Sequence, residues 1–227
     1  MPDGPGTCTV PGAVGCAGAR CEDEQVSDLQ CAATLVVARH GDAEYVESWF
    51  SDEGGTLTGE GREQARRLGD SLARHRVAWV WTSDSSRAVQ TAEIVAARLG
   101  VGVTVRKPLR EVSLGELHGQ PFDVELIHKV TDHWYTGDLE PGFPGGENGE
   151  EVVARYRDQL AEIADLHRGE TVLVVTHQTA TCIALPALAD NLPSSYARDH
   201  ELGNGQAAEL MVDGDGWRVT RWAGQNC

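Results

Sequence analysis

Two histidines stand directly after two aliphatic segments of the sequence. His40 follows residues 35–38 and Arg39, and His177 follows residues 172–176. Segments of this length and composition are typical of buried strands in a parallel sheet. Ligands of open α/β sheets bind beyond the carboxyl ends of the strands. Both imidazoles and the neighbouring guanidinium would therefore meet at one rim, where a nucleophile and a cationic partner suit the transfer of a phosphoryl group.

The rest of the chain alternates between strand patterns and helix patterns, which predicts right-handed crossovers and a mainly parallel sheet. The fold class that follows is α/β: a three-layer sandwich with a mainly parallel central sheet flanked by helices. Residues 111–148 are expected to be irregular. The remaining expected elements are strands at 77–81 and 101–105, helices at about 58–75, 85–99, 147–167 and 178–188, and a hairpin that joins 207–212 to 217–222.

A boundary in composition divides the chain. Residues 1–32 are rich in Gly, Pro, Ala and Cys, and we expect a poorly ordered leader there, followed by one catalytic domain over 33–227. Four of the six cysteines fall in the leader, and their spacing does not match the paired patterns of zinc ligands. Free thiols are the expectation for them, and a disulfide clip or a metal site is the alternative.

The overall charge excludes some classes of partner. A net charge of −16 disfavours nucleic acids and anionic membranes, which bind basic surfaces. No apolar segment approaches the roughly 20 residues that span a bilayer, and the start of the chain lacks the features of a secretory signal. We therefore expect a cytoplasmic protein. Its richness in Ala, Gly and Arg is typical of GC-rich bacteria. The oligomeric state is open, with a homodimer as one arrangement that the sequence allows.

An ordered set of motifs resembles the histidine phosphatase superfamily, which includes the cofactor-dependent phosphoglycerate mutases. The resemblance covers roughly residues 34–222, and its order along the chain is more specific than any single tripeptide. The motifs are Arg39-His40-Gly41, Leu57-Thr58-Gly59-Glu60-Gly61, the segment 82–92 with Arg87, Leu109-Arg110-Glu111, Leu114-Gly115-Glu116-Leu117-His118-Gly119, Pro144-Gly145-Gly146-Glu147 and Thr176-His177.

The resemblance implies a phosphoglycerate mutase-like fold and a role for each matching residue. His40 would be the nucleophile and would pass through a phosphohistidine. Arg39, Arg87 and His177 would bind the phosphoryl oxygens, with His177 protonated or acting as a hydrogen-bond donor, and Gln178 would contact the substrate beside them. This electrostatic clamp requires no metal and no cofactor.

Glu111 is the expected general acid and base. It would protonate the leaving alkoxide and then activate water, a contribution that is typically worth about 10²–10⁴ in rate. Glu116 lies close in sequence and is the competing candidate. The predicted function is that of a metal-independent hydrolase of phosphoric monoesters, of the histidine acid phosphatase type, that acts on a small-molecule phosphate.

Departures from the mutase pattern favour hydrolysis over phosphoryl transfer. Ala43 and Val46 stand where mutases carry Ser or Thr and Asn, and residues 178–180 read Gln-Thr-Ala where mutases have Gly-Asn-Ser. The middle segment offers only Lys129 after Arg110 to hold a second anionic group.

Three alternatives remain. One is a phosphohistidine protein phosphatase, which shares Arg-His-Gly-Asp-Ala but lacks the acid segment. The others are a phosphoglycerate mutase-type phosphotransferase and a non-catalytic phosphate-binding module.

Aromatic residues suggest what kind of alcohol the phosphate is attached to. The residues expected to line the substrate pocket are Trp49, Phe50, His118, Phe122, Trp134 and Phe143. As a hypothesis, such a lining favours a monophosphate with a bulky or partly apolar leaving group.

Overall fold

The computed structural model describes residues 31–45, 49–51 and 54–227. The predicted leader therefore lies almost entirely outside the described residues, as do Cys8, Cys16, Cys21 and Val46. Cys31 is described and is an exposed free thiol. The division of the chain at residue 32 stays a prediction.

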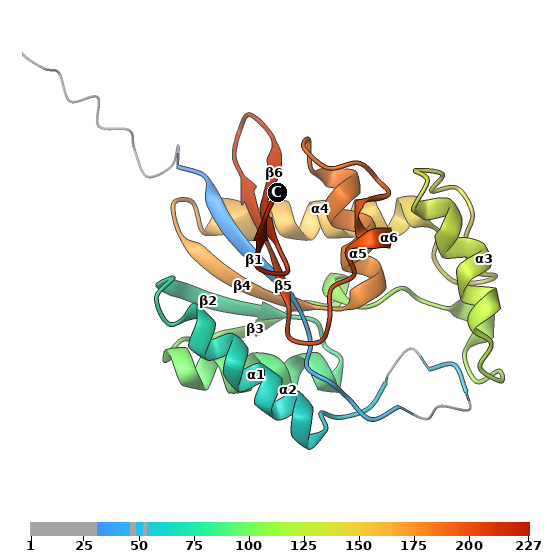
Figure 1. Ribbon diagram of the computed structural model, residues 1–227, viewed down its shortest axis with the longest axis horizontal. Helices are drawn as coiled ribbons and strands as arrows, with labels where there is room; N and C mark the ends of the chain where they lie inside the picture. The colour runs from blue at the N-terminus through green and yellow to red at the C-terminus, as the bar shows by residue number, and fades with distance from the viewer. Residues whose placement is uncertain (1–30, 46–48, 52–53) are drawn as a thin grey trace, which may run out of the picture.

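A single seven-stranded sheet forms the centre of the molecule, in the order β3-β2-β4-β1-β5-β6-β7 (Figure 1). The first four strands along the chain run parallel to one another, and the last three add an antiparallel edge. The sheet is therefore mainly parallel, as predicted. The strands are β1 (Ala33–Arg39), β2 (Val77–Thr82), β3 (Val103–Val105), β4 (Thr171–Thr176), β5 (Ala207–Val212), β6 (Trp217–Trp222) and β7 (Gln225–Asn226).

Helices cover both faces of this sheet, which gives the three predicted layers (Figure 1). The helices α1 and α2 pack on one face, against Val36 and Val175, while α4 and α5 pack on the other, against Val37 and Val174. Neighbouring residues of one strand thus point into opposite cores. This explains why the central residues of β1 and β4 are all aliphatic. The helices are α1 (Gly59–Leu72), α2 (Ser86–Leu99), α3 (Val124–Trp134), α4 (Gly149–Leu166), α5 (Gln178–Leu188) and α6 (Tyr196–Asp199).

The expectation of an irregular segment over residues 111–148 is wrong in part, because α3 lies within it. Asp123 caps this helix by accepting a hydrogen bond from the backbone N–H of Glu125. Thr131 and Trp134 are buried, and Ile127 and Val130 pack against the same core, so α3 has an apolar face at helical spacing that the sequence analysis missed. Two short 3₁₀ turns, Lys107–Leu109 and Gly115–Leu117, precede it.

The register of the sheet places the two histidines side by side. Arg39, the last residue of β1, is paired with Thr176, the last residue of β4. His40 and His177 follow these residues, and the backbone N–H of His40 donates to the carbonyl oxygen of Thr176 across 3.0 Å. The strand β2 ends beside β4, so the start of α2 reaches the same rim. In the described part of the chain, no helix has the length and apolar character needed to cross a membrane.

Candidate active site

His40 is a buried imidazole with a defined tautomer. Its Nδ1 atom lies 2.7 Å from the carbonyl oxygen of Gly41. Because a carbonyl oxygen only accepts, Nδ1 carries the proton and Nε2 presents a lone pair. Burial, reinforced by the charges of Arg87 and Arg39, lowers the pKa of His40 to about 3. The ring is therefore neutral at ordinary pH, which is the state that a nucleophile requires.

Glycine is required at the position after His40. A Cβ atom on Gly41 would lie 2.4 Å from the carbonyl oxygen of Gly61, where the start of α1 crosses the end of β1. The backbone N–H of Gly41 also donates to Thr91 on α2 across 3.0 Å. Contacts with two helices thus fix the peptide that orients His40.

Arg87 links the two histidines. It stands in the first turn of α2, and only 4% of it is exposed. Its Nε atom donates to Nε2 of His40 across 3.0 Å, and its Nη2 atom donates to Nδ1 of His177 across 3.1 Å. A buried cation at a helix N-terminus is unfavourable by itself. Its position between two imidazoles places a positive charge at the centre of the candidate site.

His177 is the N-cap residue of α5 and is fully buried. Its Nδ1 atom accepts from Arg87, so Nε2 carries the proton and donates to Oγ of Ser83 across 2.7 Å. Burial and the charge of Arg87 hold the pKa of His177 well below its usual range. In this arrangement the ring is neutral, and its donor hydrogen points to Ser83, a residue to which the sequence analysis assigned no role.

Arg39 lies at the same rim with part of its guanidinium unsatisfied. Its Nη1 atom donates to the carbonyl oxygen of Leu202 across 2.9 Å. Its Nε atom is buried and has no acceptor among the described residues. A buried donor without an acceptor is costly, and an anion would satisfy it.

Glu111 reaches the site from the loop between the two 3₁₀ turns. Its Oε1 atom accepts from the backbone N–H groups of Val112 (3.0 Å) and Ala180 (2.8 Å), and its Oε2 atom accepts from that of Thr179 (3.0 Å). Two of these donors belong to the first turn of α5, directly after His177. Since each carboxylate oxygen has two lone pairs, Oε2 keeps one for a further partner.

The structure separates Glu111 from its competitor. Glu111, Arg87 and Thr179 line one inner cavity of about 230 Å³. Glu116 is exposed and lies against the turn at Gly145 instead.

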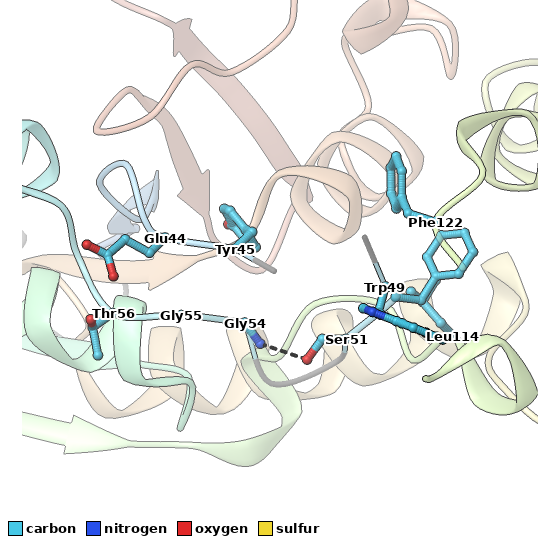
Figure 2. A pocket seen from close by; sticks show the side chains of 10 residues that line it. Glu44, Tyr45, Trp49, Ser51, Gly54, Gly55, Thr56, Leu114 and Phe122 are labelled. Atoms are coloured by element: carbon cyan, nitrogen blue, oxygen red, sulfur yellow. Dashed lines mark hydrogen bonds between the residues drawn. The ribbon is translucent and has the colours of Figure 1, made fainter. Parts of the chain in front are cut away.

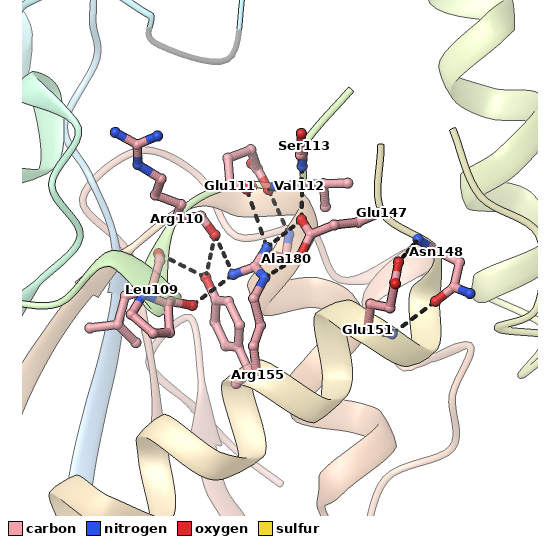
Figure 3. A network of polar contacts seen from close by, with 12 residues as sticks. Leu109, Arg110, Glu111, Val112, Ser113, Glu147, Asn148, Glu151, Arg155 and Ala180 are labelled. Carbon is pink, nitrogen blue, oxygen red and sulfur yellow. Dashed lines mark hydrogen bonds and ion pairs between the residues drawn. The ribbon is translucent and has the colours of Figure 1, made fainter. Parts of the chain in front are cut away.

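A partly buried ion pair holds the segment that carries Glu111 (Figure 3). Arg155 of α4 donates to Glu147 through Nε (2.6 Å) and Nη2 (2.9 Å). The same guanidinium donates to the carbonyl oxygens of Pro108, Arg110 and Glu111 across 2.7, 2.7 and 3.2 Å. Although burial opposes its charge, the hydrogen bond to Glu147 leaves the pKa of Arg155 raised. One side chain thus fixes the backbone on both sides of Arg110.

Tyr45 is a site residue that the sequence analysis missed. Its hydroxyl lies 3.5 Å from Nε2 of His40, and its ring centroid lies 5.7 Å from the guanidinium carbon of Arg87. Nearby, a Cβ atom on Gly54 would lie 1.9 Å from Nη1 of Arg87, and Gly54 has a φ of +61°. The loop after Tyr45 therefore approaches the guanidinium as closely as bare backbone allows.

A larger cavity of about 840 Å³ opens beyond Tyr45 and contains Trp49, Phe50 and Phe122 in its lining (Figure 2). Phe143 lines the inner cavity. These four aromatic residues line one or both of the two cavities, and their contact with a substrate stays a prediction.

Two of the expected lining residues, and the expected substrate-binding residue Gln178, line neither of these cavities. Trp134 is buried and donates to the carbonyl oxygen of Pro141 across 2.7 Å, so it packs α3 against the body of the protein. His118 is an exposed residue that follows the second 3₁₀ turn, and it lines neither cavity. Gln178 lines, with Arg198, a polar cavity of about 280 Å³ that adjoins the inner cavity at Ile127 and Thr179.

No group of three or more His, Cys, Asp or Glu side chains within the described ranges is arranged to hold a metal ion. The candidate site is instead built from two imidazoles, two guanidinium groups and one carboxylate, which are groups that can bind and transfer a phosphoryl group.

Comparisons with known proteins agree with this chemistry. The chain is 30% identical over 205 residues to phosphoglycerate mutase-like protein 4 of Arabidopsis thaliana, which covers 84% of each chain. It is 26% identical to the probable phosphoglycerate mutase GpmB of Salmonella choleraesuis, over 83% of this chain and 89% of that protein.

Solved structures of other proteins are also similar to this chain. A mycobacterial glucosyl-3-phosphoglycerate phosphatase matches with a TM-score of 0.71 and 26% identity, over 86% of this chain and 100% of its own. YhfR of Bacillus stearothermophilus matches with a TM-score of 0.71 and 30% identity, over 86% and 98%. The family model of the histidine phosphatase superfamily (branch 1) matches residues 35–225, and the protein belongs to this superfamily.

Proposed function

We propose that the protein is a metal-independent phosphomonoesterase that hydrolyses a small-molecule phosphate through a phosphohistidine at Nε2 of His40. The observation that carries this proposal is the contact of that lone pair with Arg87 at 3.0 Å, in a ring held neutral by burial. A nucleophile and the cation that would bind its target thus already share one buried site. The name of the mycobacterial phosphatase supports hydrolysis as the reaction class.

The phosphoryl group would bind between the two guanidinium groups. Arg87 would turn its N–H donors from the imidazoles to the equatorial oxygens, and the unsatisfied Nε of Arg39 would donate to the same group. Removing Arg87 from Nε2 of His40 frees the lone pair at the moment when the phosphorus atom arrives. Binding of the substrate and release of the nucleophile would then be one event.

In the first step Nε2 of His40 attacks phosphorus, and the bond between phosphorus and the ester oxygen breaks. The leaving alkoxide takes a proton from Oε2 of Glu111. The phosphorylated imidazole keeps its proton on Nδ1 and becomes cationic, and the carbonyl oxygen of Gly41 at 2.7 Å stabilises that charge.

In the second step water attacks the phosphohistidine from the side that the alcohol has left. Glu111, now a carboxylate, takes a proton from the water, and the bond between phosphorus and Nε2 breaks. Inorganic phosphate leaves and His40 returns to its neutral form. The same carboxyl oxygen serves both steps, as microscopic reversibility requires of a residue on the leaving-group side.

Phosphoryl transfer of the mutase type is the second candidate, because two relatives carry phosphoglycerate mutase in their names. Ala43 at the position of a mutase hydroxyl and the basic residues missing from segment 111–128 support hydrolysis instead. The two reactions differ in their products, since only a hydrolase releases inorganic phosphate from a single substrate.

The test is phosphate release from a panel of phosphomonoesters in the presence of a chelator. We expect activity from the wild type and its loss in His40→Ala. His133→Ala is the matched control, since His133 is exposed and paired with Asp138 outside the site. Failure of every ester to release phosphate, or activity that survives in His40→Ala, would contradict the proposal. Isomerised phosphoglycerate without phosphate release would favour the mutase reaction.

A further inference from the structure

Two adjoining cavities lead away from the phosphoryl site. The inner one contains Arg87 and Glu111 in its lining, and the outer one does not. Phe50, Leu114 and Phe122 line both cavities, so the two spaces share part of their walls and adjoin. The alcohol part of a phosphomonoester bound at Arg87 would extend past Glu111 toward the outer cavity.

The walls of the outer cavity contain large aromatic side chains that are partly exposed to solvent. Trp49 is 51% exposed and Phe122 is 53% exposed, although both are large apolar side chains. The ring of Phe122 lies 5.0 Å from that of the buried Phe50, and Figure 2 shows Trp49 and Leu114 beside it. Exposed apolar side chains that gather around a cavity mark a binding surface.

The charges around this cavity exclude a second anionic group on the substrate. Glu44 is the only charged residue among the described residues that line the outer cavity. In the sequence, residues 42–61 and 111–128, which supply all of its lining, contain no Lys and no Arg. A carboxylate or a second phosphate placed there would meet the carboxylate of Glu44 and apolar rings, with no Lys or Arg among the described lining residues to pair with.

We propose that the outer cavity binds the alcohol part of the substrate, and that this part is an uncharged aromatic group joined to the phosphate by a short linker. This inference rests on the proposed function and names the substrate class of the same site. The linker crosses the inner cavity beside Glu111. The ring stacks among Trp49, Phe50 and Phe122, where each aromatic contact adds affinity beyond the burial of area.

The test compares three esters of alcohols with similar chemical reactivity: 3-phenylpropyl phosphate, propyl phosphate and 3-phosphoglycerate. Alkyl esters are chosen because an activated aryl leaving group would raise the rate without any binding. We expect kcat/KM for the phenylpropyl ester to exceed that for the propyl ester by about 10- to 100-fold. Equal values, or 3-phosphoglycerate as the best of the three, would overturn the inference and leave the proposed function intact.

Substitutions in the outer cavity test whether its aromatic residues cause the preference for the phenylpropyl ester. Trp49→Ala and Phe122→Ala are each expected to lower kcat/KM for the phenylpropyl ester by roughly 2- to 10-fold. Trp49→Ala should not change the value for propyl phosphate by more than about twofold, because Trp49 lines the outer cavity and not the inner one. Trp79→Ala is the control, since Trp79 is a half-exposed tryptophan on β2 that hydrogen bonds to Thr104. A parallel loss for both esters would assign the effect to folding and contradict the inference.

Binding of non-hydrolysable analogues tests the substrate preference of the outer cavity separately from the proposed hydrolysis. Calorimetry with 3-phenylpropylphosphonate and propylphosphonate measures the preference of the cavity without any chemistry. Tighter binding of the phenylpropyl compound, reduced in Trp49→Ala, would support the inference even if no ester were hydrolysed. Active hydrolysis with equal affinity for both phosphonates would support the proposed function and overturn the inference.

Discussion

The Nε atom of Arg87 donates a 3.0 Å hydrogen bond to Nε2 of His40. Since the same guanidinium also donates to Nδ1 of His177, one side chain fixes the protonation of both imidazoles. Both rings are neutral, and the positive charge between them comes from arginine, which keeps its charge at any working pH. The site thus holds a neutral imidazole and a permanent cation a hydrogen bond apart.

The first prediction concerns that cation. Arg87→Gln should lower kcat/KM by roughly 10²–10³, the usual effect of removing a donor that stabilises charge in the transition state. Arg66→Gln, which changes an exposed arginine on α1 paired with Glu63, is the matched control and should keep its activity. Steady-state kinetics on the best ester checks this. Equal activity of Arg87→Gln and the control would remove Arg87 from the mechanism.

The second prediction distinguishes Glu111 from Glu116. Glu111→Gln should lower kcat for alkyl phosphates by about 10²–10⁴, because the alkoxide would leave without a proton. An ester with a good leaving group, such as 4-nitrophenyl phosphate, does not need the acid in the first step. With that ester the phosphoenzyme should accumulate, since the variant also lacks the base for the second step.

Glu116→Gln is the control for this prediction and should stay within about twofold of the wild type, because Glu116 lies against Gly145 outside the inner cavity. Rates from both esters and a rapid-quench measurement of bound phosphate provide the check. If Glu116→Gln showed the larger loss on alkyl esters, the assignment of the acid would be wrong.

The third prediction concerns the positioning of Glu111 by Arg155. Lysine keeps the charge but cannot replace a fork that reaches Glu147 and three backbone carbonyl oxygens. Arg155→Lys should therefore lower kcat for an alkyl phosphate much more than for 4-nitrophenyl phosphate, with little change in KM. A purely structural role would lower both rates in proportion to the folded fraction, which circular dichroism at the assay temperature measures.

The fourth prediction is a dependence of stability on pH. His40 has a pKa of about 3 in the folded protein and about 6.5 when unfolded. Between these values the unfolded chain binds a proton that the folded protein does not, so stability is lost as pH falls below about 6.5. At pH 5 this one group should cost about 2 kcal/mol relative to pH 7.5.

Urea unfolding of the wild type and of His40→Gln at the two pH values, in a buffer without phosphate, measures this cost. Other groups titrate in both proteins, so the difference between the two pH dependences isolates His40. We expect the variant to lose less stability than the wild type on acidification. An identical loss in both proteins would mean that His40 is not a buried neutral ring.

The sequence predicted the elements that are strongly patterned. The aliphatic strands β1 and β4, the helix α2 with its C-cap at Gly100, and the hairpin of β5 and β6 lie within a few residues of the expected bounds. These segments bury apolar faces, and burial is what hydrophobic periodicity reports. The helix α3 was missed although Ile127, Val130 and Trp134 recur at helical spacing on the face that packs against the core.

The residues of the candidate site also divide into those that the sequence could place and those that it could not. His40, His177 and Arg87 could be placed because they follow strands or open a helix at one rim of the sheet. Tyr45 could not, because a loop of irregular conformation brings its hydroxyl to His40. The role of Arg155 was also hidden, since its acceptors are backbone carbonyl oxygens from a segment 44–47 residues away. A sequence pattern contains no signal for such contacts.

The central claim is the covalent intermediate on His40, and trapping it is the most direct measurement. Glu111→Gln would be mixed with 4-nitrophenyl phosphate and a chelator, quenched in base, and digested for mass spectrometry. The account predicts one phosphoryl group on His40 that is stable in base and lost in acid, and none in the double variant with His40→Ala. Phosphate release by the wild type with no phosphorylated His40 in the trapped variant, or with the group on another residue, would contradict the account.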